Sequence, residues 1–159
     1  MRQPIGSVLA WTGSVARLVV GVVWIVAGLL KLPDPAASVR AVRAYQLLPE
    51  STVTVIGYGL PILELCLGLL LVVGLGTRAV AVLSALLFVA YIIGISSAWA
   101  RGLQIDCGCF GGGGFAADAT SKYPGEIARD TGLLALCAFL AVFPRTMVCL
   151  LYTSDAADE

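Results

Sequence analysis

The 159 residues carry no formal net charge at pH 7; 59% of them are hydrophobic and only 13% are charged. This balance is the reverse of that in a soluble domain, and it predicts an integral membrane protein whose surface faces the lipid bilayer. The chain has no basic cluster, which argues against nucleic-acid binding. It also has no histidine, which excludes Ser-His-Asp, Cys-His and histidine–metal chemistry within the chain.

Four apolar stretches predict membrane-spanning helices, since a bilayer core needs roughly 20 mostly apolar residues per helix. They cover about 15–32, 53–75, 77–99 and 131–143, and the last is short. We therefore expect an all-α polytopic membrane protein, a bundle of about four transmembrane helices, formed by residues 1–148 as a single domain. Residues 149–159 look like translated sequencing-adaptor read-through, and we expect them to be a non-native or disordered tail.

A short helix is expected between the first two spans. Asp34 is a good N-cap and Pro35 a good first helical residue. At 100° per residue the apolar side chains gather on one side, while Arg40 and Arg43 lie on the other. This segregation is typical of a helix lying in the membrane interface. A connector that serves packing alone fits the same pattern.

Two cysteines, Cys107 and Cys109, lie in the loop before the fourth span, followed by four glycines at 111–114. We expect a mobile segment that carries an exposed dithiol near the membrane surface. One intervening glycine allows a very small disulfide ring, which strains disulfide geometry and favours easy reduction. The pair is therefore a candidate for thiol–disulfide exchange. A purely structural pair and a soft-metal site, for example for Cu(I), are the alternatives.

Glu64 lies well inside the second predicted span. A carboxylate at that depth is costly and usually faces the bundle interior or a partner. Lys31, at the end of the first span, is a candidate partner. The two residues form a candidate polar intramembrane site for a proton or a ligand, and a structural contact that fixes the helix register is the alternative.

Four motifs together resemble the MauE family of methylamine-utilisation membrane proteins, which is related to DoxX-like four-helix proteins. They read AGLLKLPD at 27–34, YQLLP at 45–49, LPxxELxxG at 60–68 and DCGCFG at 106–111. The resemblance implies that Cys107 and Cys109 are the redox pair of a thiol–disulfide oxidoreductase, and it marks Lys31 and Glu64 as motif positions. It also implies a thioredoxin-like partner and a role in maturation of the methylamine dehydrogenase small subunit.

Thiol oxidation requires an oxidising compartment, so we expect a multi-pass protein of the cell (plasma or inner) membrane with the CGC loop extracytoplasmic. The lysine and arginine count leans the other way, with four on the terminal side and six on the loop side. A quinone against the bundle is a candidate electron carrier, although the sequence shows no specific site for it. A non-catalytic assembly scaffold and metal handling through the CGC pair are alternative functions, and the oligomeric state is undefined by sequence.

Overall fold

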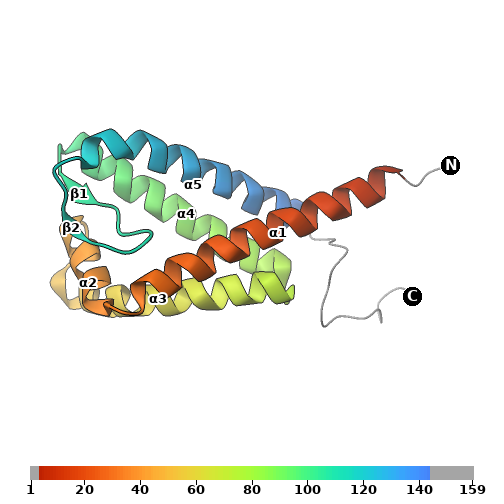
Figure 1. The fold of residues 1–159 in the computed structure, drawn as a ribbon, viewed down its shortest axis with the longest axis horizontal. Coiled ribbons are helices and arrows are strands. Elements are labelled where there is room, and N and C mark those ends of the chain that lie inside the picture. Colours follow the sequence, from red (N-terminus) through yellow and green to blue (C-terminus); the bar gives the residue numbers. More distant parts are fainter. Residues whose placement is uncertain (1–3, 144–159) are drawn as a thin grey trace.

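The computed structural model describes residues 4–143, and the predicted tail at 149–159 lies outside this range. The described chain forms helices and one small antiparallel ribbon (Figure 1). In chain order these are α1 (Pro4–Lys31), α2 (Pro35–Ala44), α3 (Glu50–Val73), α4 (Thr77–Ala100), β1 (Ile105–Asp106), β2 (Gly114–Phe115) and α5 (Ala119–Val142). The short helix α2 and the ribbon lie at the end of the bundle opposite to the start of α1 and the end of α5 (Figure 1).

Three of these helices are long and apolar enough to cross a membrane: α3, α4 and the part of α1 from Leu9 to Lys31. Large aliphatic side chains stay exposed on their outer faces, as expected where lipid is the solvent. The prediction of an all-α polytopic membrane protein is therefore confirmed. The helix of the fourth predicted span, α5, begins at Ala119 and not at Thr131, and its first half is polar, which leaves only its second half apolar.

Helices α1 and α3 pack closely because glycines remove the side chains between them. A Cβ on Gly68 would lie 2.8 Å from the Gly21 carbonyl oxygen, and one on Gly28 would lie 2.9 Å from the Pro61 carbonyl oxygen. Small residues that allow two backbones to approach are the usual means of joining helices in a membrane. The same contacts show that α1 is displaced along α3. The last turn of α1 meets α3 near Pro61, so the first part of α3, before Pro61, is in contact with other elements.

Short helix α2 covers that first part of α3. It begins as the sequence predicts: the Asp34 carboxylate accepts a hydrogen bond of 3.1 Å from the Ala37 backbone N–H, and Pro35 opens the helix. Gly57 of α3 lies directly under α2, since a Cβ there would be 2.6 Å from the Val39 Cα.

The second helix pair is α4 with α5, which contact each other along their length, whereas α3 meets α4 over a much smaller surface. The core between the pairs centres on Trp24, which stacks on Phe88 at a ring distance of 4.4 Å. The indole N–H of Trp24 donates a 3.1 Å hydrogen bond to the Ser84 hydroxyl. The two helix pairs thus meet through the aromatic packing around Trp24.

Candidate functional site

The loop that carries the cysteines is held against the bundle, which differs from the predicted surface segment. Ile105 pairs with Phe115 and Asp106 with Gly114 in the ribbon β1–β2. The chain between the strands turns back into the bundle, where Cys109 is only 6% exposed. The prediction of an exposed dithiol is therefore wrong for Cys109, while Cys107 is partly exposed. The sequence did not reveal this because glycine runs carry no apolar pattern, although they allow close packing.

Glycine is required at the centre of the CGC turn. Gly108 has a φ of +68°, and a Cβ there would lie 2.6 Å from the Ala41 Cβ on α2. Its backbone N–H donates a 2.9 Å hydrogen bond to the Asp106 carboxylate. The Tyr45 hydroxyl donates to the Cys107 carbonyl oxygen at 3.1 Å. The turn is thus fixed from both sides, by its own aspartate and by a tyrosine that follows α2.

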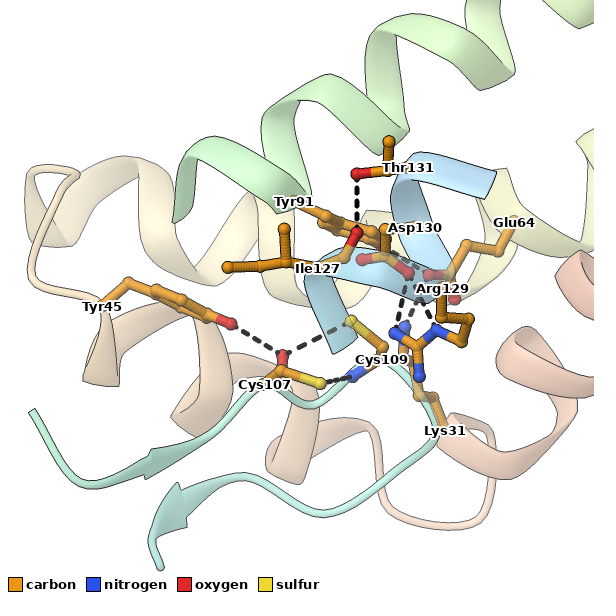
Figure 2. A network of polar contacts seen from close by, with 10 residues as sticks. All are labelled: Lys31, Tyr45, Glu64, Tyr91, Cys107, Cys109, Ile127, Arg129, Asp130 and Thr131. Atoms are coloured by element: carbon orange, nitrogen blue, oxygen red, sulfur yellow. Dashed lines mark hydrogen bonds and ion pairs between the residues drawn. The ribbon is translucent and has the colours of Figure 1, made fainter. Parts of the chain in front are cut away.

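The two sulfur atoms have different surroundings (Figure 2). The Cys109 backbone N–H donates to the Cys107 sulfur at 3.4 Å. The Cys109 thiol interacts with the Cys107 side chain, is buried, and lies near Asp130, and all three effects raise its pKa well above the ordinary value, although Arg129 acts in the opposite direction. Cys109 is therefore held as a neutral thiol, whereas Cys107 is the more exposed cysteine of the two.

An ion pair lies on one side of the cysteines. The Lys31 ammonium is 2.5 Å from Glu64 Oε1, with side chains 3% and 0% exposed. The Tyr91 hydroxyl donates a hydrogen bond of 2.5 Å to the same oxygen, and the Lys31 ammonium lies 5.8 Å from the centre of the Tyr91 ring. The structure therefore brings the two sequence-predicted residues together and adds Tyr91. A tyrosine in the middle of an apolar span was the only sequence signal for this third member.

A second ion pair lies on α5. The Arg129 guanidinium is 2.8 Å from Asp130 Oδ1, and Asp130 is 1% exposed. The guanidinium also lies 4.7 Å from the centre of the Phe110 ring, next to Cys109. Neither Arg129 nor Asp130 was among the predicted site residues, and the structure places both beside Cys109. Residues of both ion pairs therefore lie around the buried Cys109 thiol.

The other two described cysteines are separate from this site. Cys66 is exposed on α3, and Cys137 is fully buried in the core on α5. Neither lines the space around Cys107 and Cys109.

The family profile described as Methylamine utilisation protein MauE matches residues 9–143. Comparisons with curated proteins and with solved structures gave no match. The matched range contains all of the site residues described above, as well as α2 to α5 and most of α1. The chain therefore belongs to the MauE family of methylamine-utilisation membrane proteins.

Proposed function

We propose that the protein is a membrane thiol–disulfide oxidoreductase in which Cys107 exchanges with a partner protein and Cys109 is the resolving thiol. The observation that carries this proposal is the asymmetry of the pair. Cys107 is partly exposed and accepts a backbone hydrogen bond, whereas Cys109 is buried beside it with a raised pKa. An asymmetric pair of this kind suits exchange, because one sulfur meets the partner and the other completes the reaction.

The exchange step is balanced without a cofactor. A partner thiolate attacks the Cys107 sulfur of the Cys107–Cys109 disulfide, which forms a mixed disulfide and releases Cys109 as a thiol. The second partner thiol then displaces Cys107. The partner loses two electrons and two protons, and the CGC pair gains them. A thioredoxin-like protein is the partner that this chemistry and the family membership favour.

Membership in the MauE family further supports a role in methylamine utilisation. The protein that finally acquires the disulfides would be the small subunit of methylamine dehydrogenase. Disulfide formation requires an oxidising compartment, so the CGC end of the bundle would face the extracytoplasmic side of the cell membrane. Labelling of Cys107 by a membrane-impermeant thiol reagent in intact, mildly reduced cells tests this orientation. Labelling only after lysis would place the loop in the cytosol.

Trapping of the mixed disulfide tests the exchange itself. In Cys109→Ser the exchange can be trapped in its reverse direction: the Cys107 thiolate attacks the disulfide of an oxidised partner, and the mixed disulfide should accumulate because no Cys109 thiol is left to displace that partner, whereas Cys107→Ser should accumulate none. Cys66→Ser is the matched control, since Cys66 is an exposed cysteine away from the site. If neither variant captures a partner and both retain full activity in complementation, the protein is an assembly scaffold. Stoichiometric Cu(I) or Zn binding that is lost in either variant would indicate metal handling.

A further inference from the structure

A cavity of about 310 Å³ opens beside the two cysteines, between α2, α3 and α4. Most of its wall is aliphatic, as at Leu60 and Leu87, and Cys107 and Cys109 form part of it. Leu47, Leu48 and Ile56 also line it and are exposed on the outer surface, so an apolar molecule can reach it from the lipid. Ligand cavities in proteins begin at roughly this size, around 300 Å³. The space fits one ring-sized lipophilic molecule.

Two polar side chains on the wall have hydrogen-bonding capacity to spare. Ser38 is 3% exposed, and its hydroxyl has no hydrogen-bond partner among the described residues. Lys31 also lines the cavity, and its contact with Glu64 leaves further N–H donors on the ammonium group. Buried polar groups are almost always hydrogen-bonded, so an unpartnered hydroxyl on a cavity wall points to a ligand that carries an acceptor.

We propose that this cavity binds a lipid-soluble quinone, which accepts the electrons of the Cys107–Cys109 dithiol. This inference rests on the proposed function and names its electron acceptor. The aliphatic wall requires an apolar ligand, the Ser38 and Lys31 donors require acceptor oxygens, and the adjacent thiols require a two-electron oxidant. A quinone meets all three requirements, because its ring is apolar and carries two carbonyl oxygens. A lipid acyl chain meets only the first.

The redox step balances between the dithiol and the quinone. The two thiols lose two electrons and two protons and form the Cys107–Cys109 S–S bond. The quinone gains both electrons and both protons and becomes the quinol, which leaves through the aliphatic opening. Lys31 and Ser38 donate hydrogen bonds to the carbonyl oxygens, where negative charge develops as the ring is reduced. The disulfide is then ready to oxidise the next partner.

The test uses the full chain in quinone-free phosphatidylcholine nanodiscs. A photoreactive azidoquinone identifies the site by peptide mass spectrometry, and pre-reduced protein mixed with decylubiquinone reports quinol formation. Ala90→Trp places a large side chain at the cavity wall, and Val89→Trp is the matched control on the exposed face of the same helix, outside the cavity lining. We expect crosslinks on cavity residues, reduced about tenfold or more by Ala90→Trp and unchanged by Val89→Trp. Cys107→Ser should form no quinol, because it cannot form the Cys107–Cys109 disulfide.

The outcomes separate this inference from the proposed function. If the wild type oxidises reduced thioredoxin but shows no crosslink in the cavity and forms no quinol, the quinone inference is overturned and the exchange function stands. Crosslinks that are spread over all lipid-facing residues, equal in both tryptophan variants, would also overturn it and indicate acyl chains in the cavity. Cavity crosslinks with quinol formation but no mixed disulfide with any partner would remove the exchange function while the quinone site stands.

Discussion

The Lys31–Glu64 pair should contribute strongly to stability, and a double-mutant cycle measures how strongly. Lys31→Met and Glu64→Gln keep the size of each side chain and remove its charge. Both side chains are almost fully buried, and the two charged atoms are 2.5 Å apart. Removal of one partner leaves an uncompensated charge in an apolar region, which typically costs about 3–5 kcal/mol. Each single variant should therefore lose free energy of unfolding in that range.

The two losses should not add. Once both charges are gone, no unpaired charge remains. The double variant should therefore lose much less free energy of unfolding than the two single variants lose together. The coupling free energy between two residues in direct contact reaches about 3 kcal/mol, and we expect a value near that limit for a buried hydrogen bond between charged groups. Glu64→Gln should be the more harmful single change, because it also weakens the hydrogen bond from the Tyr91 hydroxyl.

The measurement is equilibrium unfolding by SDS in mixed micelles, followed by circular dichroism. The control cycle is Lys122→Met with Asp118→Asn, an ion pair of 2.8 Å at the start of α5 whose side chains are exposed. Exposed pairs are screened and couple far more weakly. Coupling at Lys31–Glu64 no larger than in this control would refute the reasoning, since the buried charges would then be solvated in the membrane-embedded protein.

Three further predictions follow from the close packing and from the buried thiol. Gly68→Ala should destabilise the protein by about 1–3 kcal/mol in the same assay, because the new Cβ meets the α1 backbone, whereas Gly59→Ala should not, since open space surrounds Gly59. Gly108→Ala should raise the alkylation rate of Cys109, because the Cβ collides with α2 and opens the turn. In the reduced wild type, Cys109 should react with N-ethylmaleimide much more slowly than Cys107 near pH 7. A raised pKa means less thiolate below it, so the Cys109 rate should climb as the pH rises toward that pKa.

Each of these has a result that would contradict it. Equal stability of the two alanine variants would show that α1 and α3 are not in close contact at Gly68. An unchanged Cys109 rate in Gly108→Ala, measured by peptide mass spectrometry, would show that the turn is not held against Ala41. Equal alkylation of Cys107 and Cys109 across the pH range would remove the asymmetry on which the proposed direction of attack depends.

Three of the four expected spans could be predicted from the sequence because membrane solvation imposes a length and an apolar composition on each helix. The fourth could not be bounded, since α5 continues the short apolar stretch with a polar first half. The α2 helix could be predicted because Asp34 and Pro35 are local signals that require no tertiary contact. The proximity of Lys31 to Glu64 also followed, since two charges in lipid have few other ways to be satisfied.

The position of the CGC turn could not be predicted, because it depends on contacts between distant segments. Tyr45 reaches Cys107 across 62 positions, and Gly108 owes its identity to a side chain on α2. Tyr123 is a further example: its hydroxyl contacts the Leu103 carbonyl oxygen at 2.6 Å and receives a hydrogen bond from the Ile105 N–H at 3.2 Å, which ties α5 to β1. Nothing in the local sequence around Tyr123 indicates that its hydroxyl joins two distant segments.

The displacement of α1 along α3 has a consequence for the membrane around the protein. Because α1 ends near Pro61, the ten or so residues of α3 before that point, about 15 Å of helix, have no long neighbour on this side. Lipid tails beside α1 therefore meet a shorter hydrophobic wall at the α2 end than those beside α4. Bilayers adjust to such mismatch by local thinning, at a cost of fractions of a kcal/mol per Å. A depression of the bilayer surface at this point would bring water closer to the buried CGC turn.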